Sequence, residues 1–88
     1  MDNFIAHILV VDDDEGIRSL VKKYLNENNF LVSTADSAES ASKKIEIIEF
    51  DLIILDIMMP GKSGLEFTKE NRKNLETPII LLTAKGEP

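Results

Sequence analysis

The sequence predicts an α/β fold, a doubly wound parallel sheet with helices on both faces. Four short runs rich in Ile, Val and Leu are continuous rather than alternating, which is typical of strands buried on both faces. Between the runs, apolar residues recur at helical spacing, so strands and helices alternate and right-handed crossovers join parallel strands. The predicted strands are Ile8–Val11, Phe30–Val32, Leu52–Leu55 and Ile79–Leu82.

Three segments between these strands are predicted to be helical. Asp14 is placed to cap the first helix and Asn28–Asn29 to end it. Ser37 can cap the second, and Ser63 opens a capping box, S-x-x-E, for the third. The first helix has the clearest amphipathic spacing, with apolar residues at Ile17, Leu20, Val21, Tyr24 and Leu25.

Composition restricts the classes of function. The 88 residues suffice for one small domain, residues 1–88, and the absence of cysteine excludes disulfides and thiolate metal ligands. A formal charge of −6 argues against direct nucleic-acid binding, which needs a basic face. The apolar runs are far too short to span a membrane, and the N-terminus does not resemble a signal peptide. We therefore expect a soluble, cytoplasmic protein with no membrane or nucleic-acid partner.

Polar residues follow three of the predicted strands at the point where each strand ends. Asp12 and Asp13 follow the first strand, Asp56 the third and Thr83 the fourth. Ligands of doubly wound sheets bind outside the carboxyl ends of the strands, so we expect these side chains to converge. Clustered carboxylates repel one another, and a Mg²⁺ ion, which prefers oxygen ligands, removes that cost. Asp56 is then a candidate nucleophile for phosphoryl transfer, with the Thr83 hydroxyl as a donor to a phosphoryl oxygen.

A second phosphate-binding interpretation fails on spacing. Lys62-Ser63 after a strand resembles the end of a P-loop, G-x-x-x-x-G-K-[ST]. The first glycine of that motif would have to occupy position 56, which is Asp56. Ser63 is better explained as a helix cap, and Lys62 as a solvated loop charge.

Three stretches resemble the receiver domain of two-component response regulators, most of all those of the OmpR/PhoB type. They are ILVVDDDEGIR, DLIILDIMMPGKSGLEF and TPIILLTAKGE, and the resemblance covers nearly the whole chain. It implies the flavodoxin-like receiver fold, here with strand order 2-1-3-4. It also implies a phosphoacceptor module that takes phosphate from a sensor histidine kinase and regulates an attached transcription-factor output.

The resemblance also assigns roles to individual residues. Asp56 matches the phosphoacceptor, and Asp12 and Asp13 match the acidic pair that holds Mg²⁺, with Asp13 the more direct ligand. The backbone carbonyl of Met58 matches a further metal ligand. Thr83 matches the switch hydroxyl, and Ala84 the small residue beside it that leaves room for access.

Receivers of this family have five strands and five helices, and the sequence stops after the fourth strand. We therefore expect a domain incomplete at its C-terminus, lacking the fifth strand, its phosphoryl-binding lysine and the last two helices. A phosphoryl adduct on Asp56 would then be weak or short-lived. The bare edge of Ile79–Leu82 further predicts self-association.

Two other functions remain open from the sequence. An aspartyl-phosphate phosphatase or transferase on a similar sheet usually carries a second aspartate two residues past its nucleophile, and position 58 is Met58. A receiver-like interaction module that does not use phosphate would have no need for the acidic trio, Asp12, Asp13 and Asp56. We therefore expect a signalling module rather than a turnover enzyme.

Overall fold

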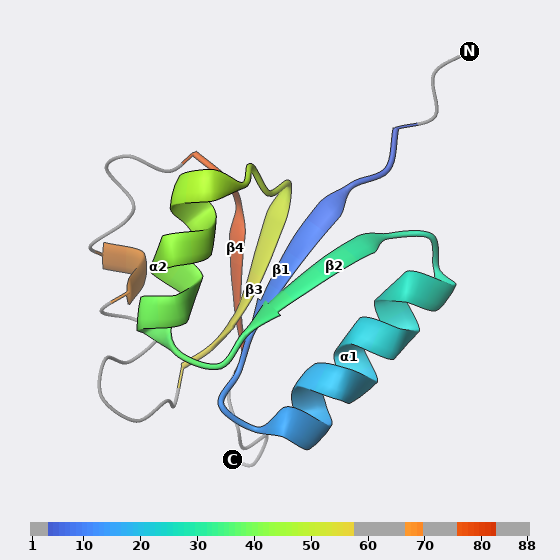
Figure 1. The fold of residues 1–88 in the computed structure, drawn as a ribbon, viewed down its shortest axis with the longest axis horizontal. Coiled ribbons are helices and arrows are strands. Elements are labelled where there is room, and N and C mark those ends of the chain that lie inside the picture. Colours follow the sequence, from blue (N-terminus) through green and yellow to red (C-terminus); the bar gives the residue numbers. More distant parts are fainter. Residues whose placement is uncertain (1–3, 58–66, 70–75, 83–88) are drawn as a thin grey trace.

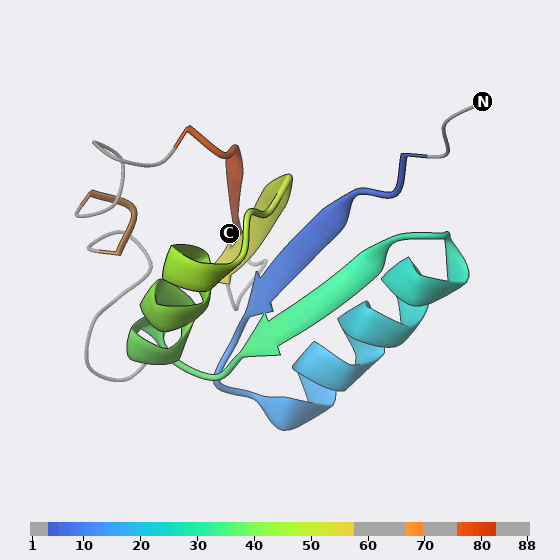
Figure 2. The same cartoon turned by 45° about the horizontal axis from the view of Figure 1, so that its top comes forward.

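The computed structural model describes residues 4–57, 67–69 and 76–82. Strands and helices alternate as predicted from residue 7 to residue 56, and all strand pairs are parallel. Figure 1 shows α1 and α2 on opposite sides of the sheet, and the view in Figure 2 agrees. The elements are β1 (His7–Val11), α1 (Glu15–Glu27), β2 (Leu31–Ala35), α2 (Ala38–Ile47), β3 (Leu52–Asp56) and β4 (Ile79–Leu82).

The strand order is β2-β1-β3-β4, which confirms the predicted order and fold class. After β1 the chain pairs first on one side, through β2, and then crosses to the other side to form β3. The point where the order reverses lies between β1 and β3, whose register aligns Val11 with Leu55. Residues just beyond these two therefore meet at the switch point of the sheet.

Helix α1 begins and ends where local chemistry predicts. The Asp14 side chain accepts a hydrogen bond from the backbone N–H of Ile17 at 3.1 Å, as an N-cap does. At the other end Asn28 is the C-cap, and Asn29 has φ = 70°, the left-handed conformation that asparagine tolerates. Both ends of the helix therefore agree with the sequence prediction.

Helix α2 is capped by Ser37, whose hydroxyl accepts from the backbone N–H of Ser40 at 3.1 Å. Its buried residues are the small Ala38 and Ala41, which let the helix lie close to the sheet. Ile48 is the C-cap of the helix, and it packs against the buried cluster that contains Ala38 and Ala41.

Each face of the sheet has its own core. On the α2 face the largest fully buried side chains include Leu9, Ile53, Leu55 and Phe67. On the α1 face, Val21 and Leu25 pack on a smaller cluster: Ile8, Val10 and Val32. Alternate residues of each strand serve the two faces, so the strands need the continuous apolar runs seen in the sequence.

The amino ends of β1 and β3 are joined by a reciprocal pair of hydrogen bonds. The backbone N–H of His7 donates to Asp51 Oδ2, and the Asp51 N–H donates to the His7 carbonyl, each at 2.8 Å. The His7 ring is paired with the Ser33 hydroxyl at 2.8 Å and packs edge-on against Phe50. His7 is therefore a structural residue at the end of the sheet away from the acidic trio.

The structure corrects the bounds of the second predicted strand. It runs from Leu31 to Ala35, so Phe30 is not part of it and the strand is longer than predicted. The predicted start of the third helix, at Ser63, lies outside the described residues. Residues 67–69 are helical, and Phe67 is fully buried, which agrees with a helix in this region that packs inward.

Candidate functional site

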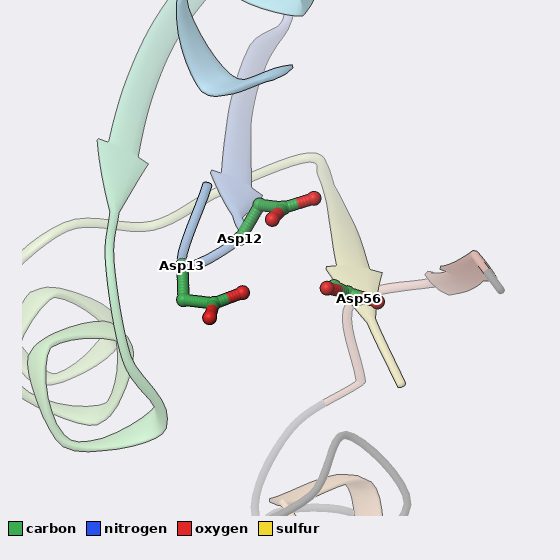
Figure 3. A group of neighbouring side chains, drawn as sticks. All are labelled: Asp12, Asp13 and Asp56. Carbon is green, nitrogen blue, oxygen red and sulfur yellow. The ribbon is translucent and has the colours of Figure 1, made fainter. Parts of the chain in front are cut away.

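Three carboxylates meet at the switch point of the sheet, as Figure 3 shows. Asp12 follows β1 directly, Asp13 is next to it, and Asp56 is the last residue of β3. One carboxylate oxygen from each of the three residues lies within 4.8 Å of the others. The convergence expected from the strand ends is therefore present in the structure.

Backbone hydrogen bonds hold the acidic turn in place. The N–H of Asp12 donates to the Ala35 carbonyl at 3.1 Å, which ties the turn to the end of β2. The Asp12 Oδ1 atom accepts from the N–H of Asp14 at 2.9 Å. This is the side-chain-to-backbone turn that aspartate favours, and it leads directly into the N-cap of α1. Asp12 thus both shapes the turn and contributes a carboxylate to the site.

Burial makes the charge on Asp12 costly. Asp12 and Asp56 are 6% and 7% exposed, whereas Asp13 is exposed. Loss of solvent raises the pKa of Asp12 above its usual range. The hydrogen bond from the Asp14 N–H lowers this pKa, whereas the negative charges of Asp56, Asp13 and Asp14 raise it further. A raised pKa means that the folded chain binds this proton more tightly than the unfolded chain. The metal-free fold therefore loses this contribution to stability as the pH rises through the raised pKa.

The donor set fits a hard divalent cation. All the grouped ligands are carboxylate oxygens, which suit Mg²⁺. Those of Asp12 and Asp56 are buried at the ends of β1 and β3, and that of Asp13 is exposed to solvent. A bound cation would also remove the mutual repulsion that contributes to the raised pKa of Asp12.

Two cationic side chains near this edge were not identified from the sequence. Arg18 Nη1 donates to the Asp12 carbonyl at 2.8 Å, and Lys44 Nζ donates to the Thr34 carbonyl. Both line a small polar pocket at the end of β2, of about 200 Å³, together with Asp36 and Ser40. The signal available in the sequence was the position of Arg18 near the start of α1. Long side chains on a helix point back toward its N-terminus, so Arg18 can reach the carbonyl of Asp12, two residues before the N-cap Asp14.

Three predicted site residues lie outside the described residues. They are Met58, Thr83 and Ala84, and their roles stay predictions. The same holds for Lys62 and Ser63. The structure thus brings together the acidic part of the predicted site, contributed by β1, β3 and the turn between β1 and α1.

The fold and the site define a class of protein: a doubly wound parallel α/β domain with an acidic, oxygen-ligand site at its switch point. Comparison with known proteins narrows this class. Residues 8–88 match the family described as the response regulator receiver domain, and the chain belongs to this family.

Curated relatives include transcriptional regulators. The chain is 51% identical over 81 residues to the protein PetR of Rhodobacter capsulatus and 46% identical over 80 residues to the transcriptional regulatory protein ResD of Bacillus subtilis. These matches cover 92% and 91% of this chain but 34% and 33% of the relatives. The chain therefore spans about a third of the length of these proteins.

Solved structures agree with the fold. The response regulator TrrA of Thermotoga maritima, solved in complex with Mg²⁺ and BeF, is 48% identical with a TM-score of 0.86, covering 93% of this chain and 72% of that one. The chemotaxis protein CheY4 of Vibrio cholerae is 35% identical with a TM-score of 0.88, covering 97% of this chain and 73% of that one.

Neither α1 nor α2, the two labelled helices of the described part, has the length and apolar character needed to cross a membrane.

Proposed function

We propose that this chain is a phosphoacceptor receiver module in which Asp56 accepts a phosphoryl group with the help of Mg²⁺. The observation that carries the proposal is the meeting of the Asp12, Asp13 and Asp56 carboxylates at the switch point. Three carboxylates this close repel one another, and a purely structural role would not require that cost. The phosphoryl donor we propose is a sensor histidine kinase, the partner that membership of the family favours.

In the proposed reaction, one oxygen of the Asp56 carboxylate attacks the phosphorus atom of the donor. A phosphorus–oxygen bond forms, and the bond between phosphorus and the donor breaks, with its electron pair leaving on the donor. Asp56 is buried at the end of β3, so its carboxylate is held in place for attack. Asp12 and Asp13 hold the cation, and bound Mg²⁺ supplies positive charge that offsets the charge of the phosphoryl group.

The remaining roles come from the family and complete the proposal. The Met58 carbonyl adds a ligand to the metal, the Thr83 hydroxyl contacts the phosphoryl group, and Ala84 leaves space for it. The module accepts the phosphoryl group on its own Asp56 rather than turning over a substrate, so we propose a signalling role rather than an enzymatic one. The phosphatase or transferase alternative is disfavoured by Met58, and a phosphate-independent module by the acidic trio.

The relatives suggest the setting of the module. PetR and ResD are about three times longer than the matched region, and ResD is described as a transcriptional regulatory protein. We propose that this receiver controls a transcription-factor output in the cytoplasm. The net charge of −6 supports an indirect route to DNA, through the output rather than through contacts of this chain.

Magnesium binding tests the metal part of the proposal. Titration with MgCl₂ should shift the backbone amide signals of Asp13 and Asp56 in NMR spectra of the 88-residue chain. Replacing Asp13 with Asn removes a charged ligand and should weaken Mg²⁺ binding by about tenfold or more, a change of about 1.4 kcal/mol for each factor of ten. The dissociation constant from the titration is the measurement.

A matched control separates coordination from net charge. Asp36→Asn removes the same charge from an exposed residue that is not part of the acidic trio, so it should leave the Mg²⁺ affinity nearly unchanged. Amide signals that do not move at millimolar Mg²⁺ would contradict the metal site. Equal weakening by both variants would show that the effect is general electrostatics.

We also propose that a second copy of the chain pairs along the outer edge of β4. Among the described residues, β4 hydrogen-bonds to β3 on one side only, and its Ile80 and Leu82 side chains are exposed. An apolar strand with one open edge can pair with another chain. Sedimentation velocity over a range of concentrations should show an association, and a single monomer species at the highest concentration would exclude it.

A further inference from the structure

Arg18 makes a contact that the acidic trio itself does not explain. Its Nη1 atom donates a 2.8 Å hydrogen bond to the main-chain carbonyl of Asp12, in a partly buried position. Arg18 is also near the start of α1, where its own N–H donates to the Asp14 carbonyl at 3.0 Å. The side chain therefore reaches back over the start of the helix onto the turn that carries the site.

The contacted carbonyl belongs to the peptide group between Asp12 and Asp13. Because a peptide group is planar, fixing its oxygen also fixes its N–H and the direction in which the chain enters Asp13. Asp12 is anchored independently, by its N–H bond to Ala35 and by its carboxylate bond to the Asp14 N–H. Asp13 is exposed, and the orientation of this peptide sets the direction in which its side chain leaves the backbone.

We propose that Arg18 is a positioning residue for the metal site, one that holds the Asp12–Asp13 peptide so that the Asp13 carboxylate faces Asp12 and Asp56. The inference rests on the proposed Mg²⁺ site and deepens it. The role assigned to Arg18 is exerted through the main chain, by way of the Asp12 carbonyl, and not through the metal ion or the phosphoryl group.

Electrostatic repulsion and positioning predict opposite changes in Mg²⁺ affinity when the Arg18 side chain is replaced. A guanidinium close to a cation site repels the cation, so removing the charge of Arg18 would strengthen Mg²⁺ binding if electrostatics dominated. Positioning predicts weaker binding, because an Asp13 carboxylate that is free to turn away must be ordered when the metal binds. The sign of the change therefore separates the two roles.

Arg18→Met tests the proposal, with Lys44→Met as the matched control. Both substitutions remove one positive charge from a helical side chain that donates to a carbonyl at this end of the sheet, but Lys44 contacts Thr34 of β2 rather than the acidic turn. We expect Arg18→Met to weaken Mg²⁺ binding about three- to tenfold, a change in affinity that corresponds to the net free energy of one hydrogen bond. Lys44→Met should leave the affinity unchanged or slightly stronger.

The NMR spectrum of the metal-free chain provides a readout that does not depend on Mg²⁺. A hydrogen bond to a peptide oxygen polarises the N–H of the same peptide. Arg18→Met should therefore move the Asp13 amide proton upfield, whereas Lys44→Met should move that of Ala35 and leave Asp13 in place. Arg18→Lys keeps the positive charge and a hydrogen-bond donor on a shorter side chain. Its Mg²⁺ affinity and its Asp13 amide shift should lie between those of the wild type and Arg18→Met.

The outcomes separate this inference from the proposed function. If the wild type binds no Mg²⁺, the proposed site is wrong, whatever the Asp13 amide shows. If the wild type binds Mg²⁺ and Arg18→Met binds it equally or more tightly, Arg18 is not a positioning residue. An unchanged Asp13 amide in Arg18→Met would overturn the contact itself. Affinity is compared only between chains whose spectra show the folded state, so a general loss of stability cannot imitate the expected result.

Discussion

Asp56→Asn is expected to abolish phosphoryl incorporation from a small donor such as acetyl phosphate. The amide lacks the carboxylate oxygen that would form the phosphorus–oxygen bond, while its size and its place at the end of β3 are retained. Intact-mass measurement after a rapid acid quench, with Mg²⁺ present, should show one phosphoryl group on the wild type and none on the variant. Early time points limit the loss of the phosphoryl group by hydrolysis.

Asp51→Asn is the matched control for this experiment. It makes the same chemical change just before β3, at the opposite end of the strand, where the amide oxygen can still accept the hydrogen bond from the His7 N–H. This variant should be modified like the wild type. Incorporation into Asp56→Asn would place the acceptor elsewhere, and a wild type that is never modified would contradict the proposed role of Asp56 in this chain.

Ile53→Ala is expected to remove a large part of the stability of the fold. Ile53 is fully buried, pairs with Leu9 in the register of β1 and β3, and belongs to the core on the α2 face. Truncation of such a side chain costs about 2–5 kcal/mol, because transfer free energy is lost and a cavity is left. A domain of this size has a total free energy of unfolding of about 4–13 kcal/mol, so the loss is a substantial fraction of it.

Urea denaturation followed by circular dichroism measures this loss. Ile47→Ala provides the control, since it is the same chemical change on α2 at a residue that is 81% exposed. Its free energy of unfolding should stay within about 0.5 kcal/mol of the wild type. A loss below about 1 kcal/mol in Ile53→Ala would mean that the core on the α2 face closes around the missing atoms.

The fold was predictable because its determinants are local or periodic. Continuous apolar runs mark strands that are buried on both faces, and the caps at Asp14, Ser37 and Asn28 follow from side chains that satisfy nearby backbone groups. The acidic part of the site was predictable for a related reason. Polar residues that end buried parallel strands share one edge, so Asp12 and Asp56 could be brought together before their positions were known.

What the sequence did not predict depends on contacts between elements. The second strand extends to Ala35 through Ser33 and Thr34, polar residues that pairing with β1 recruits into the sheet. The apolar stripe of α1 is wider than the part that packs on the sheet, so Leu20 remains 67% exposed. The contact of Arg18 with a main-chain carbonyl leaves no pattern in the residue types, because any carbonyl can accept.

The reciprocal bonds between His7 and Asp51 have a consequence for the opposite end of the sheet. Asp12 lies five residues after His7, and Asp56 five residues after Asp51, so two paired strands of equal length separate the two pairs. Sliding one strand by two residues would displace its carboxylate by about 6.6 Å, and sliding it by one would send the side chain to the other face. The register set at His7 and Asp51 thus determines whether Asp12 and Asp56 lie side by side. Inserting or deleting a single residue in either strand would separate the two carboxylates without altering any residue that touches them.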